Sequence, residues 1–88
     1  MDSPTHERLV TGGVDTHKDT HTAAALDASG RHLGTETFPT TAAGYAALQQ
    51  WLRSFGRVVR VGVEGTGSYG VGLTRELRAG GLEVVEVN

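Results

Sequence analysis

Residues 58–70, with the sequence VVRVGVEGTGSYG, contain the strongest strand signal of the chain and the turn that follows it. Valine occupies four of the first six positions, and β-branched side chains favour extended backbone. Glu64 ends the run, and the glycines after it let the chain turn sharply. We therefore expect a strand from Val58 to Glu64 that ends in a carboxylate and a tight turn over Gly65–Gly70.

The segment that follows this turn has a helical pattern and then a strand pattern. Val71–Ala79 is amphipathic, and Gly80 and Gly81 stop it. Leu82–Val87 alternates valines with charged residues and is predicted to be a strand. Because a helix connects two strands here, we expect the strands to be parallel and the connection right-handed.

A longer amphipathic helix precedes the central strand. Thr40 or Thr41 can cap its N-terminus, and the helix is expected to continue to about Phe55, with Gly56 as its C-cap. Its apolar side chains recur at helical spacing and form the largest block of predicted core: Tyr45, Leu48, Trp51, Leu52 and Phe55.

Three further strands are expected before this helix, at Leu9–Asp15, Thr20–Asp27 and His32–Phe38. The links between them are short, so these strands should form an antiparallel meander. The predicted order is β-β-β-α-β-α-β, and a first strand beside the fourth gives an α/β mixed sheet of order 3-2-1-4-5. Residues 1–7 are polar and are expected to be a flexible tail, so residues 8–88 would form one domain.

Composition narrows the possible functions. The chain has 88 residues and a net charge of −2. It contains no cysteine, which excludes a disulfide framework and thiolate chemistry. No apolar run approaches the roughly 20 residues that span a bilayer, and the polar N-terminus is not a secretory signal, so we expect a cytoplasmic protein without membrane contact. Without an excess of Lys and Arg, nucleic-acid binding would need metal ions or basic surface elsewhere in a longer protein.

Two carboxylates are expected to meet at one edge of the sheet. Asp15 ends the first strand and Glu64 ends the fourth, and parallel neighbours lie about 4.8 Å apart. Two carboxylates this close favour a shared proton or a bound cation, and oxygen ligands suit Mg²⁺ or Mn²⁺, which support phosphodiester transfer. A second interpretation stays open, in which Asp15 caps a turn and Glu64 is a solvated charge.

Gly65–Gly70 also matches the G-x-G-x-x-G pattern of a dinucleotide-binding turn between a strand and a helix. Glu86 stands at the distance where the ribose-binding acid is expected. Against this Rossmann-like alternative, Glu64 would repel a pyrophosphate, and such folds do not open with a three-stranded meander. A structural remnant without activity is a further alternative. His17 and His21 flank a turn, so their spacing does not indicate a zinc pair.

Three stretches of the sequence carry a resemblance to a known family. They are GGVDTHKDTHTAAALDASGR (12–31), FPTTAAGYAAL (38–48) and VGVEGTGSYG (61–70). Together they resemble the N-terminal region of the DEDD insertion-sequence transposases, the insertion-sequence-110-type enzymes that include bridge-RNA-guided recombinases. The resemblance covers nearly the whole chain beyond the tail.

The resemblance implies an RNase H-like (RuvC-type) fold and metal-dependent phosphoryl transfer on DNA during transposition. The first two of the family's four acids match Asp15 and Glu64, which are thus the expected catalytic metal ligands for Mg²⁺ or Mn²⁺. The other two acids, and a second domain with a serine implicated in strand exchange, would lie beyond Asn88. We therefore expect a truncated, C-terminally incomplete domain that binds metal weakly and is inactive alone.

The same resemblance makes DNA the expected partner, with a guide RNA in the full-length protein. Lys18 near the metal edge and Thr66, Ser68 and Tyr69 in the glycine turn are candidates for nucleic-acid contact, because helix N-terminal amides can hold phosphate. Self-association is also expected, because an incomplete domain would leave apolar surface uncovered.

Overall fold

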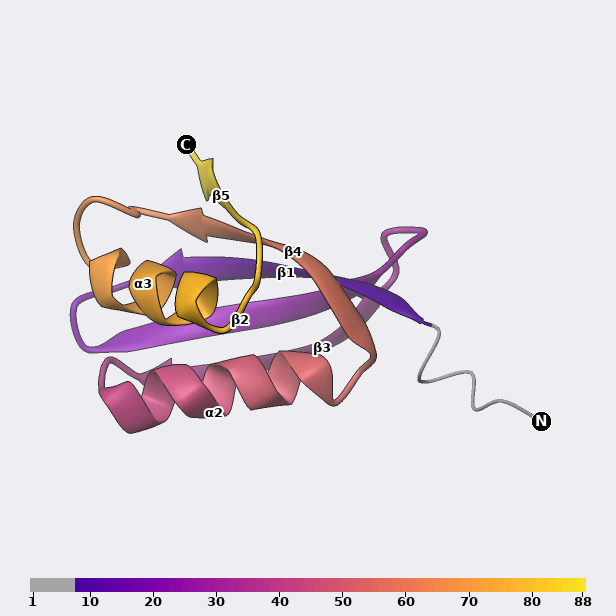
Figure 1. The fold of residues 1–88 in the computed structure, drawn as a ribbon, viewed down its shortest axis with the longest axis horizontal. Coiled ribbons are helices and arrows are strands. Elements are labelled where there is room, and N and C mark those ends of the chain that lie inside the picture. The colour runs from indigo at the N-terminus through magenta and orange to yellow at the C-terminus, as the bar shows by residue number, and fades with distance from the viewer. Residues whose placement is uncertain (1–7) are drawn as a thin grey trace.

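A computed structural model describes residues 8–88, which form a five-stranded mixed sheet and two helices (Figure 1). The sheet order is β3-β2-β1-β4-β5; β1 pairs with β2 and β2 with β3 in antiparallel fashion, whereas β4 is parallel to both β1 and β5. The predicted fold class and sheet order are confirmed. The tail predicted at residues 1–7 lies outside the described residues. The elements are β1 (Leu9–Thr16), β2 (Thr20–Asp27), β3 (His32–Pro39), α2 (Ala42–Arg53), β4 (Arg57–Glu64), α3 (Val71–Ala79) and β5 (Val84–Val87).

The N-terminus of α2 is fixed by a capping hydrogen bond and a close backbone contact. Thr41 is the N-cap, and its side chain accepts a hydrogen bond from the Gly44 amide at 3.0 Å. A β-carbon at Gly44 would collide with the carbonyl oxygen of Pro39, so only glycine lets the end of β3 lie this close to the first turn of α2. Leu48 and Leu52 then point at the sheet and are fully buried.

The ends of both helices differ in detail from the sequence prediction. Helix α2 ends at Arg53 with Ser54 as its C-cap, and Gly56, predicted as the cap, lies in the link to β4. Helix α3 ends at Ala79 in a Schellman motif, in which the Leu82 amide donates to the carbonyl oxygen of Leu77 at 3.0 Å. Leu82 is therefore part of the helix stop, and β5 begins at Val84 instead of Leu82.

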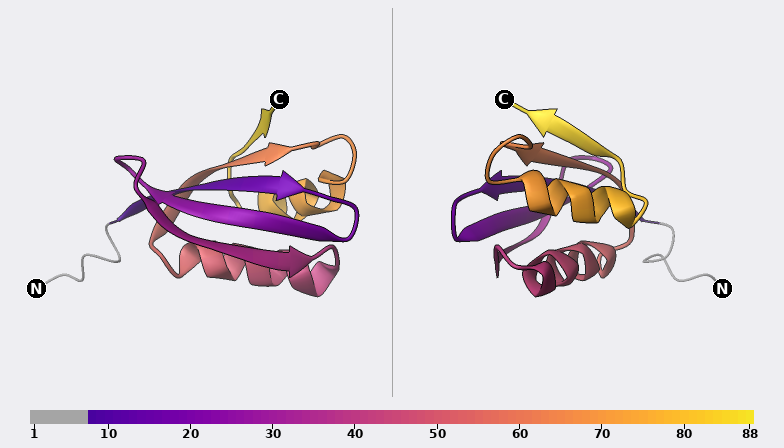
Figure 2. Two further views of the ribbon diagram at one scale, coloured as in Figure 1. Left: turned by 180° about the vertical axis from the view of Figure 1, so that it is seen from behind. Right: turned by 60° about the vertical axis from the view of Figure 1, so that its left-hand side comes forward.

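Both helices cover the same face of the sheet, as the two views of Figure 2 show. Residues that alternate along the inner three strands face the helices and are buried: Val10, Val14, Ala23, Ala25, Val61 and Val63. Trp51 of α2 extends this core, with its ring centroid 5.8 Å from Phe38 and 5.0 Å from Phe55. Within residues 8–88 no element covers the opposite face, and no helix is long and apolar enough to cross a membrane.

Candidate metal centre at two strand ends

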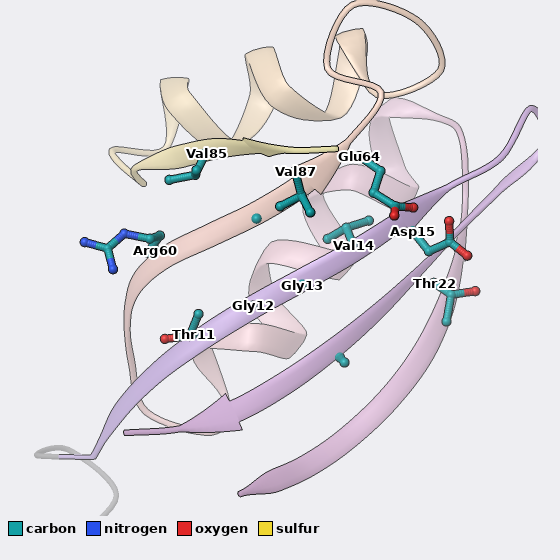
Figure 3. Close-up of a pocket in the computed structure, with 12 residues that line it drawn as sticks. Thr11, Gly12, Gly13, Val14, Asp15, Thr22, Arg60, Glu64, Val85 and Val87 are labelled. Atoms are coloured by element: carbon teal, nitrogen blue, oxygen red, sulfur yellow. The ribbon is translucent and has the colours of Figure 1, made fainter. Parts of the chain in front are cut away.

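The carboxyl groups of Asp15 and Glu64 lie next to each other at one end of the sheet. The parallel pairing of β1 with β4 continues to Val14 and Val63, and the two acids are the next residue on each strand. Their side chains project toward one another on the face that the helices leave open (Figure 3). The predicted placement of the two acids on parallel neighbouring strands is thus confirmed.

The pKa values of the two carboxyl groups are shifted in opposite directions. A hydrogen bond with Glu64 lowers the pKa of Asp15, and a second hydrogen bond, with His17, lowers it further. The hydrogen bond with Asp15 and the negative charge of that residue raise the pKa of Glu64. This pattern is expected when two carboxylates lie within hydrogen-bonding distance, because the second ionisation must occur beside an existing negative charge. Asp15 therefore ionises at lower pH than Glu64, and a cation between the two groups would favour ionisation of both.

His17 is the neighbour of this pair that the sequence analysis missed. Its Nε2 lies 3.1 Å from Oδ2 of Asp15, and both side chains are largely exposed. The turn after β1 brings the ring back beside the strand end, where the His17 amide donates to the Thr20 carbonyl oxygen. An i to i+2 spacing across a turn carries no readable signal, so only the structure reveals this contact. His21 faces the other side of the sheet, where its ring stacks on that of Tyr45 with 5.8 Å between the ring centroids. It therefore forms no metal-binding pair with His17.

The turn between β4 and α3 is held by its own backbone. The amides of Ser68 and Gly70 both donate to the carbonyl oxygen of Gly65, at 3.0 and 2.8 Å. Gly65 has a φ of 63°, in the left-handed region where glycine is favoured, so the chain leaves the sheet directly after Glu64. Since these amides already have partners within the turn, they are not free to surround a pyrophosphate. The Rossmann-like alternative, in which this turn binds a dinucleotide, therefore gains no support.

The four candidate nucleic-acid residues lie on two turns at the same end of the sheet as the acids (Figure 1). Lys18 is exposed in the turn between β1 and β2, and its carbonyl oxygen accepts a hydrogen bond from Thr40 at 3.1 Å. Thr66 is half-buried in the turn between β4 and α3, whereas Ser68 and Tyr69 are exposed there. Tyr69 is 57% exposed, which is unusual for a large aromatic side chain and leaves its ring free for contact.

A shallow groove of about 690 Å³ extends from the acids along the open face of the sheet (Figure 3). Small residues form its floor, with Gly13, Ala24 and Gly62 on three adjacent strands. Val85 and Val87 of β5 line one side, and Arg60 lies at the end away from the acids. The Nη2 atom of Arg60 lies 3.6 Å from Oε1 of Glu83. Apart from Asp15 and Glu64 the lining is therefore mostly apolar.

The donors at the strand ends are two carboxylates, and within residues 8–88 no group of three or more His, Cys, Asp or Glu side chains could enclose a metal ion. A five-stranded mixed sheet in this order, with both helices on one face, is consistent with the RNase H-like class of α/β domains.

Sequence comparison identifies the family within that class. The model of the DEDD transposases of insertion-sequence-110 type, described as Transposase, matches residues 12–88. The chain belongs to this transposase family, whose members act on DNA and generally use divalent metal ions. A comparison with curated proteins finds no match.

Proposed function

We propose that residues 8–88 form the N-terminal part of an RNase H-like transposase domain in which Asp15 and Glu64 hold Mg²⁺ for phosphoryl transfer on DNA. The observation that carries this proposal is the pair of carboxyl groups that project toward one another from adjacent parallel strand ends. Family membership supports the DNA substrate, because transposases cut and join DNA strands.

The residues present fit part of a divalent metal site. Both donors are carboxylates, the ligand type that Mg²⁺ and Mn²⁺ prefer, and a cation between them would relieve the repulsion between their negative charges. When bound, such an ion can activate a water or hydroxyl nucleophile and neutralise charge on the transferring phosphate. Two side chains leave most coordination positions to water, so binding to this chain should be weak, and we expect no DNA cleavage without the family's two other acids.

We assign direct nucleic-acid contact to the two turns that flank the acids. The Lys18 ammonium is suited to a phosphate, and the hydroxyl groups of Thr66 and Ser68 are suited to phosphate or sugar oxygens. The exposed ring of Tyr69 is suited to stack on an unpaired base. These contacts would place the nucleic acid across the end of the sheet where the carboxylates lie.

Three further properties follow from this proposal. A guide RNA would supply target recognition in the full-length protein, as the resemblance to the bridge-RNA-guided recombinases implies. Self-association would cover the exposed side chains of Leu9, Val85 and Val87. We also propose that the protein acts in the cytoplasm, where a transposase would meet its DNA.

Titration of the purified chain with Mn²⁺, followed by amide NMR, tests the metal site. Paramagnetic broadening should centre on Asp15 and Glu64 and should be lost in Asp15→Asn, which keeps the shape of the side chain but removes its charge. Glu36→Gln is the matched control, because Glu36 is an exposed carboxylate on the edge strand β3. Equal broadening at all exposed carboxylates, or broadening that survives in Asp15→Asn, would contradict the proposal.

A parallel titration with NAD separates the Rossmann-like alternative. Shifts confined to Gly65–Gly70 would favour a dinucleotide module, whereas the transposase proposal predicts no specific response to NAD. If neither Mn²⁺ nor NAD perturbs the spectrum, the chain has a structural role only.

A further inference from the structure

The two acids lie just past the point where backbone pairing between their strands stops. The register of β1 with β4 ends at Val14 and Val63, so the ladder itself does not hold Asp15 against Glu64. On its other side β1 remains paired with β2 as far as Thr16 and His21. The distance between the two carboxylates therefore depends on whatever joins these two strand ends beyond the ladder.

Thr16, the last residue of β1, makes that connection. Its Oγ1 donates a hydrogen bond to the carbonyl oxygen of Glu64 at 2.8 Å, a contact between residues 48 positions apart in the sequence. The residue after Glu64 is Gly65, where a β-carbon would come within 3.1 Å of the same hydroxyl oxygen. The chain thus leaves the space that Thr16 needs to reach the backbone of the acid on the other strand.

We propose that Thr16 is a positioning residue of the two-carboxylate site: its hydroxyl holds the end of β4 against the end of β1, so that Asp15 and Glu64 can bind one divalent cation together. This inference rests on the proposed function. Because the hydroxyl proton is already donated to the carbonyl oxygen of Glu64, Thr16 acts through that residue and does not need to contact metal or nucleic acid itself.

Substitution of Thr16 tests this role. Thr16→Val keeps the shape and the strand preference of the side chain but removes the hydroxyl, and we expect Mn²⁺ affinity at Asp15 and Glu64 to fall about three- to tenfold, as the loss of one hydrogen bond would predict. Thr16→Ser retains the hydroxyl and should stay within about twofold of the wild-type affinity. Thr16→Ala provides a second variant without the hydroxyl, should valine disturb the strand end.

Thr40→Val is the matched control, because the Thr40 hydroxyl also donates to a backbone carbonyl oxygen, that of Lys18, at 3.1 Å. It should leave Mn²⁺ affinity unchanged, which separates loss of positioning from general loss of a threonine hydrogen bond. Normal Mn²⁺ binding by Thr16→Val and Thr16→Ala, or an equal loss in Thr40→Val, overturns the role of Thr16 alone. Absence of broadening at Asp15 and Glu64 in the wild-type chain overturns the proposed metal site, and this inference with it.

Discussion

The carboxyl groups of Asp15 and Glu64 project toward one another from the ends of two parallel strands, and their pKa values are shifted in opposite directions. A hydrogen bond with Glu64 lowers the pKa of Asp15, and a second one with His17, whose Nε2 lies 3.1 Å from Oδ2 of Asp15, lowers it further; Asp15 in turn raises the pKa of Glu64. Both side chains are exposed, which lets a metal ion reach the pair from solvent. Proton and metal therefore compete for the same oxygen atoms.

Asp15→Asn should bring the pKa of Glu64 down toward its ordinary value, because it removes both the hydrogen bond with the Asp15 carboxylate and the negative charge that raise this pKa. Carbon-13 NMR of the side-chain carboxyl groups, recorded as a function of pH, measures this directly. Glu36→Gln, which changes a carboxylate on β3, should leave the titration of Glu64 unchanged. A Glu64 titration that is the same in Asp15→Asn and in the wild type would show that the two carboxyl groups do not interact in solution.

Mn²⁺ affinity should increase with pH across the range in which Glu64 loses its proton. The pKa of Glu64 is raised by Asp15, so at low pH the cation must displace the proton of Glu64, and affinity should change by up to about tenfold per pH unit below that pKa. Above the pKa of Glu64 both carboxyl groups are ionised, and the Mn²⁺ affinity should become constant. Broadening measured at a series of pH values checks this, and a pH-independent affinity would argue against Glu64 as a ligand.

The sequence predicted the positions of the two acids but not the contacts that tune them. Val58–Glu64 has so strong a strand pattern that the central strand and its terminal carboxylate were readable, and helix crossovers then required parallel neighbours. The hydrogen bonds of His17 to Asp15 and of Thr16 to Glu64 depend on the path of two turns, which residue spacing does not determine. The start of β5 was misplaced because Leu82 completes the Schellman motif of α3, although its apolar side chain suits a strand equally well.

Gly12→Ala should destabilise the fold and Gly13→Ala should not, because these adjacent residues of β1 face opposite sides of the sheet. A β-carbon at Gly12 would come within 3.0 Å of Leu52 Cδ1, so Gly12→Ala should destabilise the fold by about 1–3 kcal/mol. A β-carbon at Gly13 meets no atom within 4 Å, and Gly13→Ala should be neutral or stabilise by up to about 1 kcal/mol. Urea unfolding of the two variants measures the difference. A loss of stability in Gly13→Ala equal to that in Gly12→Ala would mean that the groove face is covered in solution.

His21 should make the fold sensitive to mild acid. Its side chain has no exposed surface, and neither Nδ1 nor Nε2 has a hydrogen-bond partner among the described residues. Burial lowers the pKa of His21 below its ordinary value of 6.5, so the folded chain keeps the ring neutral at a pH where the unfolded chain binds a proton. The free energy of unfolding should therefore fall as the pH drops below about 6.5, by no more than about 1.4 kcal/mol per pH unit, until the folded pKa is reached.

His21→Leu removes this effect together with two unpartnered buried nitrogens, so its free energy of unfolding should be about equal to that of the wild type at pH 7 and higher than it at pH 5. His32→Gln is the control for the loss of an imidazole, because His32 is exposed at the start of β3. Urea unfolding of the three proteins at both pH values provides the comparison. If His21→Leu loses as much stability as the wild type between pH 7 and pH 5, protonation of His21 does not drive the acid sensitivity, and the carboxylates become the groups to test.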